Sequence, residues 1–299
     1  MSLAIVFAVA AHGEPDALIE QAENLATTCP NSRIVVFDGA PDPSWRATVD
    51  LPFAAQSRPL RHGYLSDFHY LVMQDVLQRY PGFDCLVTLD SDVFAVKPGL
   101  EDQLAGLLRA FAYLGARLHP VAARTEWATG RRFMYHWSRH WQPLLQAPTP
   151  FGAFNPGQVF RRDVVERIVA DESVPALLDA VRQARTTALE EIVYPTLVLS
   201  RGFAGTSHPG AHALTLRRYS DEELAWFALD PSVFLVHKIG TEPTAPDRRL
   251  VREFAAGRSP GPSPPPAGVG ASARDSRTTG FRFLLRSVAG DARILALGP

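Results

Sequence analysis

The chain has 299 residues, of which 46% are hydrophobic and 20% are charged, and its formal net charge is -1. A chain of this length forms one large α/β domain or a domain with additions. The balanced charge gives no footprint for nucleic acid as the main partner. Only two of the 30 basic residues are lysines, Lys97 and Lys238, a bias typical of GC-rich bacterial genomes. The two cysteines, Cys29 and Cys85, indicate neither a disulfide framework nor a thiolate metal site.

The first 15 residues, MSLAIVFAVAAHGEP, are mainly apolar but lack the basic segment that opens a secretory signal. We therefore expect a first core strand here rather than a signal peptide. No other apolar run in the sequence is long enough to span a bilayer. These features predict a soluble, cytoplasmic protein.

Strand and helix patterns alternate over about the first 115 residues. The predicted elements are strands at 3–12, 32–43 and 85–89, and helices at 14–29, 65–80 and 98–114. Ser66 is expected to cap the second of these helices, which carries apolar residues on one face. This order predicts an α/β fold with an open, mostly parallel sheet flanked by helices, in which ligands bind beyond the carboxyl ends of the strands.

The second half is less regular. A Gly/Pro turn, a short strand and a helix are predicted over 151–169, an acidic helix start over 187–199, and a late strand over 231–240. Residues 257–280 are rich in Pro, Gly and Ser, which predicts a linker. We expect residues 281–299 to form a short helix that docks back, and its basic and apolar residues could also contact a membrane surface. The predicted organisation is one domain over 1–256, with halves 1–115 and 116–256.

Asp90 and Asp92 directly follow the apolar sequence CLVTL. They stand at the carboxyl end of a predicted strand, where an open α/β sheet collects ligands. Two carboxylates at this spacing suit Mg²⁺ or Mn²⁺, ions that often bind substrate phosphates through one or two carboxylates. The alternative is a pair of turn aspartates that cap local amides.

Aromatic residues gather in the stretch 124–144, where they could contact a sugar or an aromatic acceptor, or could pack a subdomain. Arg131 and Arg132 within this stretch hint at an anionic acceptor. The aromatic residues are Trp127, Phe133, Tyr135, Trp137 and Trp141.

The sequence LVTLDSDVF resembles the DxD motif of GT-A-fold glycosyltransferases, in which two aspartates hold a divalent cation against the diphosphate of a nucleotide-sugar. PFGAFNPGQVF is similar to the loop and strand that line the donor sugar in that fold, and VFLVHKIG to its late histidine motif. The resemblance spans roughly residues 3 to 240. It implies the GT-A (nucleotide-diphospho-sugar transferase) fold with a less regular acceptor-side half, and metal ligation by Asp90, Asp92 and His237. Without this order of motifs, His237 reads as a core histidine.

Within that fold, residues 61–92 and the sequence EEIVYPTL most resemble the core-2/I-branching N-acetylglucosaminyltransferase-like family. Those enzymes generally lack the DxD pair and work without a metal, so their sugar specificity is not carried over. The resemblance implies that Glu191 is the catalytic base of an inverting reaction, with Glu190 orienting it or binding an acceptor hydroxyl. An acidic first helical turn explains the same two residues without catalysis.

The resemblance also places the nucleotide and donor contacts. The candidates are the turn after the first strand, the end of the second strand, an arginine before the helix at 65–80, the DxD pair and the glycine-containing loop. Asp38 could instead open a β-turn, the arginine could be solvated, and an Asn-Pro-Gly turn explains the loop. The candidate residues are Ala11, His12, Asp38, Arg61, Asp90, Gly157 and Gln158.

The sequence therefore predicts a metal-dependent, inverting glycosyltransferase that uses a nucleotide diphosphate sugar, most readily a UDP-sugar, and a small-molecule or cell-envelope acceptor. A sugar nucleotidyltransferase of related fold and a catalytically inactive nucleotide-sugar-binding protein are the alternatives. A haloacid-dehalogenase-type phosphatase would place its aspartates after the first strand. Nucleic acid is not an expected partner, and the oligomeric state is not predicted.

Overall fold

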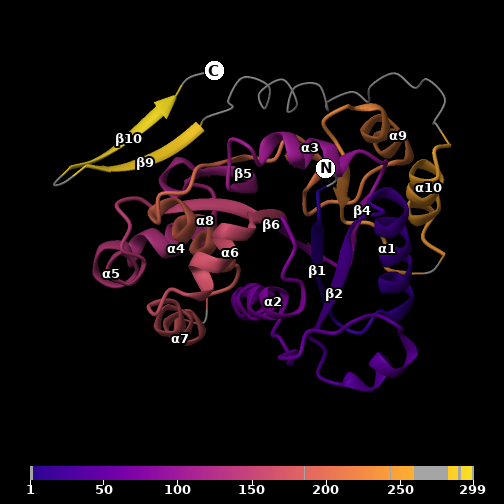
Figure 1. The fold of residues 1–299 in the computed structure, drawn as a ribbon, viewed down its shortest axis with the longest axis horizontal. Coiled ribbons are helices and arrows are strands. Elements are labelled where there is room, and N and C mark those ends of the chain that lie inside the picture. The colour runs from indigo at the N-terminus through magenta and orange to yellow at the C-terminus, as the bar shows by residue number, and fades with distance from the viewer. Residues whose placement is uncertain (1–2, 185, 243, 259–281, 289–290, 298–299) are drawn as a thin grey trace.

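The computed structural model describes residues 3–184, 186–242, 244–258, 282–288 and 291–297. Within these residues the fold is built on an eight-stranded sheet with the order β10-β9-β7-β5-β6-β3-β1-β2, and β4 and β8 form a second, two-stranded sheet. Figure 1 shows helices packed around the strands. The strands are β1 (Ile5–Ala11), β2 (Arg33–Asp38), β3 (Cys85–Asp90), β4 (Val93–Ala95), β5 (Tyr113–Pro120), β6 (Phe151–Arg161), β7 (Gly205–Ser207), β8 (Leu235–His237), β9 (Arg282–Val288) and β10 (Asp291–Leu297).

Most strands of the large sheet share one direction. β1 pairs in parallel with β2 and β3, and β5 pairs in parallel with β7. β6 is antiparallel to both β3 and β5. In the six-stranded part from β7 to β2, β6 alone therefore runs against its neighbours, which confirms the predicted mostly parallel α/β sheet. Strands from both predicted halves of the chain share this sheet.

Helices cover both faces of the sheet. Side chains of α1 and α3 join one core cluster, and those of α2, α6, α7 and α8 join the cluster on the other face. A third cluster joins β4 and β8 to α9 and α10. The helices are α1 (Pro15–Thr28), α2 (Ser66–Arg79), α3 (Leu100–Leu107), α4 (Ala128–Tyr135), α5 (Gln142–Leu145), α6 (Arg162–Val169), α7 (Val174–Ala184), α8 (Glu190–Ser200), α9 (Asp221–Leu229) and α10 (Pro246–Ala255), with shorter turns η1 (Pro43–Thr48), η2 (Val121–Ala123) and η4 (Ala211–Ala213) and the π-helical turn η3 (Trp137–Trp141).

The core strands follow from their composition. All seven residues of β1 are buried, and its side chains alternate between the two core clusters, as expected for a parallel strand covered on both faces. Helix α1 begins with Pro15, which has no backbone N–H. Proline is tolerated there because the first N–H groups of a helix have no partner within the helix. No described helix is both long and apolar enough to cross a membrane.

Two helix predictions need correction. The helix predicted over 98–114 ends at Leu107, because Tyr113 begins β5 and pairs with Phe160 and Gly205 on its two sides. Sheet pairing therefore overrides the helical apolar pattern. Ser66 is the first residue of α2 rather than its cap, and its buried hydroxyl has no partner among the described residues.

The Gly/Pro turn predicted near residue 155 lies inside β6. Leu114 of β5 pairs with Val159, but Ala116 pairs with Phe154, so residues 155–158 stand opposite a single residue of β5. Gly157 takes a φ of 81°, which its missing side chain allows. The Asn-Pro-Gly sequence thus makes a wide bulge, a feature that redirects side chains within a sheet.

The C-terminal prediction was wrong in kind. Residues 282–288 and 291–297 form an antiparallel pair, β9 and β10, rather than a helix (Figure 1). β9 joins the sheet by pairing Phe283 with Gly205 of β7. The sequence of this segment has a glycine between two short apolar runs, a pattern that predicts two strands. The helix prediction did not use this signal. Apart from residues 257 and 258, the predicted linker over 257–280 lies outside the described residues.

Arg248 joins α10 to α1 from a position with 0% of its side chain exposed. Its Nε donates to Glu20 Oε2 at 2.9 Å, and its terminal nitrogens donate to the carbonyl oxygens of Thr241 at 2.8 Å and Asp16 at 3.1 Å. Arg252 reaches the same glutamate at 3.6 Å, with 49% of its side chain exposed.

We predict that Arg248→Gln lowers the free energy of unfolding by about 3 kcal/mol, because it leaves two carbonyl groups without their donor and the Glu20 carboxylate with only the exposed Arg252. Arg252→Gln is the matched control and should cost less than about 1 kcal/mol, since its ion pair is exposed. Urea unfolding followed by circular dichroism measures both. Equal losses for the two variants would contradict the structural role of Arg248.

Candidate functional site

Helix α1 fixes the chain between β3 and β4, where the DxD sequence stands. Gln21 Nε2 donates to the carbonyl oxygens of Asp90 at 2.8 Å and Val93 at 2.6 Å. Asn24 donates to the carbonyl oxygen of Ala95 at 2.8 Å and accepts from its amide at 2.7 Å. These buried side-chain amides satisfy backbone groups that lack a strand partner. The backbone that carries both aspartates is therefore held in one conformation.

The two-stranded sheet brings His237 to the DxD sequence. β4 and β8 are antiparallel, with Val93 opposite His237. His237 Nε2 lies 3.0 Å from Asp92 Oδ1 and 3.9 Å from Asp90 Oδ2. Ligand atoms of the three side chains all lie within 4.8 Å of one another. The structure thus brings together the three predicted metal ligands, although about 145 residues separate the histidine from the aspartates.

The ring of His237 is oriented by its second nitrogen. Nδ1 contacts the carbonyl oxygen of Thr215, and because a carbonyl oxygen only accepts, Nδ1 is the donor. In the neutral ring, Nε2 then carries the free lone pair and faces the aspartates. Asp92 Oδ1 is buried and accepts no hydrogen bond from the described residues. In this neutral form, a lone pair 3.0 Å from the Asp92 Oδ1 carboxylate oxygen needs a proton or a cation between them, so the donor set fits a divalent cation.

The two aspartates are in different electrostatic states. Burial opposes the ionisation of Asp92, but its contacts with His237 and Lys238 outweigh burial and hold its pKa below the usual range. Lys238 Nζ lies 2.8 Å from Asp92 Oδ2. Burial and the charge of Asp92 raise the pKa of Asp90 to about 6. Because 30% of the Asp90 side chain is exposed, a ligand can still reach it. Burial lowers the pKa of His237, but the aspartates outweigh burial and raise it.

Asn155 connects this triad to the acidic pair at the start of α8. It lies in the bulge of β6, where its Nδ2 donates to Asp90 Oδ1 at 3.2 Å and its backbone amide donates to Glu191 Oε1 at 3.1 Å. Its own Oδ1 accepts from His69 Nε2 at 2.7 Å. His69 is fully buried, and burial lowers its pKa to about 4, so its ring is neutral. Because Asn155 Nδ2 faces the Asp90 carboxylate, its Oδ1 faces the His69 ring, and the neutral ring carries its hydrogen on Nε2.

Glu190 and Glu191 face different surroundings. Glu190 is 2% exposed, and its Oε2 accepts from the amide of Leu65 at the start of α2, at 3.4 Å. Burial, with the charge of Glu191, raises the pKa of Glu190 to about 8. Burial raises the pKa of Glu191 to about 7, although the Asn155 amide opposes the rise. Glu190 thus caps a neighbouring helix, whereas Glu191 is partly exposed beside the triad.

The turn after β1 lies beside the triad. Ala10 is in register with Asp90, and Ala11 ends the strand with its carbonyl oxygen accepting from the Gly39 amide at 2.8 Å. His12 is exposed, and its charge opposes the rise in the pKa of Asp90, which places it near that carboxylate. Ala11 and His12, two of the predicted nucleotide contacts, therefore border the same site.

Asp38 and Arg61 have local partners. The Asp38 carboxylate is fully buried and accepts from the Ala40 amide at 2.8 Å, Trp45 Nε1 at 3.2 Å and Arg46 Nε at 2.5 Å. These bonds match the turn-forming alternative for Asp38. Arg61 is exposed and lies over the ring of Tyr64, 4.9 Å from its centroid.

Gly157 and Gln158 lie in the β6 bulge. A side chain at Gly157 would come within 2.9 Å of Leu214 in addition to straining its backbone. Gln158 is fully buried and pairs with Thr88 of β3. Its Oε1 accepts from the Tyr113 hydroxyl at 2.7 Å, while its Nε2 has no partner among the described residues. Gln158 is therefore buried within the sheet, on the strand between β3 and β5, rather than open to solvent.

Sequence reasoning missed Gln21, Asn24 and His69 as supports of the site, and it treated Asn155 only as a loop amide. The available signal was a polar residue at a helical position that should face the core. Gln21 and Asn24 follow Ala17 and Leu18 at inward spacing in α1. Polar side chains at such inward positions are normally hydrogen-bonded. The spacing therefore indicated that Gln21 and Asn24 bind other polar groups of the protein.

Most of the predicted aromatic cluster is core. Phe133, Trp137 and Trp141 are 1%, 9% and 3% exposed, and Phe133 stacks on Trp141 with ring centroids 5.0 Å apart. Tyr135 is 85% exposed. Trp127 packs against Gly130 and Gly152. The packing alternative therefore describes the buried members of this cluster.

No protein-family model and no curated protein matches the sequence. Solved structures of glycosyltransferases resemble the chain. They include the galactosyltransferase LgtC with donor and acceptor sugar analogues (TM-score 0.46, 12% identity, 87% of this chain and 98% of that chain). An active-site mutant of LgtC (TM-score 0.43, 14% identity) covers the same 87% and 98%. The apo glycosyltransferase GlyE of Streptococcus pneumoniae TIGR4 (TM-score 0.43, 11% identity) covers 85% of this chain and 60% of its own.

Proposed function

We propose that the protein is a metal-dependent glycosyltransferase that moves a hexose from a nucleotide diphosphate sugar, such as a UDP-sugar, to an acceptor hydroxyl. The observation that carries the proposal is the convergence of Asp90, Asp92 and His237 at the end of β3, with Glu191 joined to them through Asn155. An open α/β sheet binds its ligands at this edge.

Asp90, Asp92 and His237 would hold Mn²⁺ or Mg²⁺, and the oxygen ligands suit either ion. When bound, the cation offsets the negative charge that grows on the leaving diphosphate. Lys238 neutralises part of the Asp92 charge, so the triad with a divalent ion keeps an excess of positive charge for the diphosphate. Ala11 and His12 border the triad from β1, which supports a nucleotide contact there.

Glu191 is the proposed catalytic base. A carboxyl group with its pKa near 7 can accept a proton from the acceptor hydroxyl at neutral pH. The Asn155 amide orients the Glu191 carboxylate, and Glu190 is already engaged with α2. Direct attack by the activated hydroxyl would invert the configuration at the sugar carbon. We place the enzyme in the bacterial cytoplasm, with a small-molecule or cell-envelope acceptor.

The metal site predicts a linked response to cation and nucleotide. Mn²⁺ with UDP should raise the melting temperature of the wild-type protein more than either alone, because ligands that bind the folded state stabilise it by about 2.7 kcal/mol at 100 times their dissociation constant. Asp92→Asn should remove the response, whereas the exposed Asp163→Asn should keep it. GDP and TDP serve as further probes in the same thermal-shift assay. No response to any of these nucleotides, with or without Mn²⁺, would refute the proposal.

Glu191→Gln should reduce transfer by about 100-fold or more, because it removes the proton acceptor. The wild-type rate should rise with pH up to about 7 and level off above it, since the base works in its ionised form. Stabilisation by nucleotide and Mn²⁺ should be unchanged in the variant. Retained turnover, or a product that keeps the anomeric configuration of the donor, would contradict the role of Glu191 as base.

Asn155→Ala should weaken Mn²⁺ binding by about 10-fold or more, because a partner that orients a ligating carboxylate contributes to metal affinity. The backbone amide that holds Glu191 is unaffected by this change. Asn31→Ala, at an exposed asparagine that binds Glu101, is the control. Calorimetric titration with Mn²⁺ measures the affinity. Equal affinities in wild type and Asn155→Ala would show that the Asn155 side chain does not position Asp90.

A further inference from the structure

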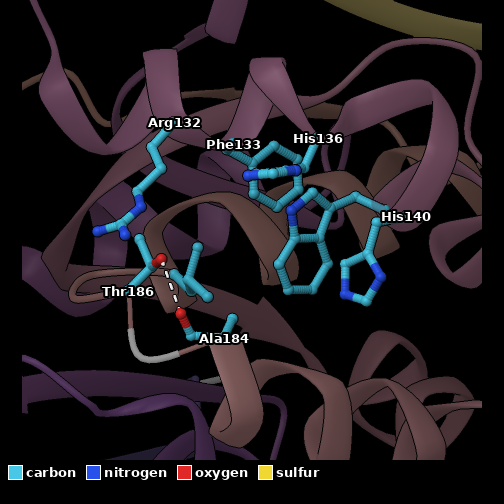
Figure 2. Close-up of a pocket in the computed structure, with 8 residues that line it drawn as sticks. Arg132, Phe133, His136, His140, Ala184 and Thr186 are labelled. Atoms are coloured by element: carbon cyan, nitrogen blue, oxygen red, sulfur yellow. Dashed lines mark hydrogen bonds between the residues drawn. The ribbon is translucent and has the colours of Figure 1, made fainter.

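A cavity of about 310 Å³ lies between α4, the turn η3 and the loop that leads into α8 (Figure 2). Its volume is at the low end of the range for small-molecule sites. Arg132, His136 and His140 stand around it, as the sticks in Figure 2 show. They follow one another at intervals of four residues, which keeps side chains on one side of a helix. The cavity therefore has a rim that offers several nitrogen donors.

The rim carries one permanent cation, the Arg132 guanidinium, which has no counter-charge among the described residues. None of the described residues that line the cavity is acidic. Among the described residues, Arg132 has no hydrogen-bond or ion-pair partner, whereas neighbouring Arg131 donates to the carbonyl oxygen of Thr125 at 2.7 Å. An unpaired guanidinium in a lining that also holds two imidazole groups, with no carboxylate among the described lining residues, suits a phosphate or carboxylate ligand.

The apolar part of the cavity lining includes a pair of stacked aromatic rings. Phe133 and Trp141 line the cavity and stack with an interplanar angle of 12°. Thr186 adds a hydroxyl that donates to the Ala184 carbonyl oxygen at 3.3 Å, drawn as a dashed line in Figure 2. An apolar floor under a polar rim matches an organic anion better than a free ion, because the ligand has carbon as well as charge to place.

The cavity adjoins the start of α8. Leu189 lines the cavity and directly precedes Glu190 and Glu191. The loop between cavity and helix is fixed on two sides, because Thr129 Oγ1 donates to the Thr187 carbonyl oxygen at 3.3 Å and the Ala188 amide donates to Gly63 at 2.7 Å. Ala188 has a φ of 59°, a conformation that persists only where its surroundings enforce it.

We propose that this cavity binds the anionic group, a phosphate or a carboxylate, of the acceptor molecule. The inference rests on the proposed glycosyltransferase function and assigns it an acceptor class. In the proposed function, the donor diphosphate binds beside the cation at the DxD site. The rim at Arg132 would then bind the other substrate, the acceptor. An acceptor held at Arg132 would extend along the loop toward Glu191, which takes the proton from its hydroxyl.

The test is a titration of the full-length protein with three probes: glucose 6-phosphate, glucuronate and uncharged glucose. EDTA is present, so that the DxD site holds no metal. The ring signals of His136 and His140, assigned from the His136→Gln and His140→Gln variants, are followed by NMR. We expect glucose 6-phosphate or glucuronate to shift both signals and glucose to shift neither. Whichever anion binds more tightly identifies the group.

Arg132→Gln should weaken this binding by about 10-fold, since it removes the charged donor. Arg139→Gln removes the same charge from an exposed residue that does not line the cavity, and it should leave binding unchanged. Failure of both anions to shift the signals, equal shifts from glucose, or equal weakening in the two variants would overturn the acceptor site. If UDP with Mn²⁺ still stabilises the protein in that case, the proposed function stands without this site.

Discussion

The structure depends on holding four carboxylates at one edge of the sheet. Asp90, Asp92, Glu190 and Glu191 would repel one another there, and burial adds to the cost of ionising them. The cost is visible in the raised pKa values of Asp90, about 6, Glu191, about 7, and Glu190, about 8. Each carboxylate has a donor from another segment: Lys238 for Asp92, Asn155 for Asp90 and Glu191, and the Leu65 amide for Glu190. The tertiary fold thus holds these acids together at a cost in folding free energy. Such an arrangement is typical of a site that binds a cation or transfers a proton.

Three residues close to these carboxylates have a backbone φ angle in the positive range. Lys238 has a φ of 83°, Ala188 has a φ of 59° and Gly157 has a φ of 81°. Lys238 directly follows His237. Ala188 lies two positions before Glu190, and Gly157 lies two positions after Asn155. A side chain at positive φ costs free energy that only enforced surroundings sustain, and such positions cluster at functional sites. The strain at Lys238 turns the chain directly after the metal ligand, and its amide donates to the Asp92 carbonyl oxygen at 3.2 Å.

The sequence predicted the parts of the site that local pattern controls. An apolar run followed by Asp90 and Asp92, within alternating strands and helices, determines where the aspartates stand. The position of His237 followed only from the order of motifs, because its strand pairs with β4 and not with the main sheet. The contacts of Asn155 and His69 were not predictable, since they need the wide β6 bulge and the packing of α2. The strand pair formed by 282–288 and 291–297 was missed because a short apolar run is compatible with either a helix or a strand.

The two candidate substrate regions carry charges of opposite sign, so they would favour different substrates. The DxD edge is acidic and repels an anion unless a cation is bound, whereas the rim at Arg132 attracts one at any time. Under the two proposals, an anionic acceptor would have one favourable position in the metal-free protein, and the donor diphosphate would gain its own position only with the cation. Specificity of this kind comes from repulsion as much as attraction. Leu189 lines the cavity and Glu191, the proposed proton acceptor, stands two residues after it, so in this proposal the base would lie between the two substrates.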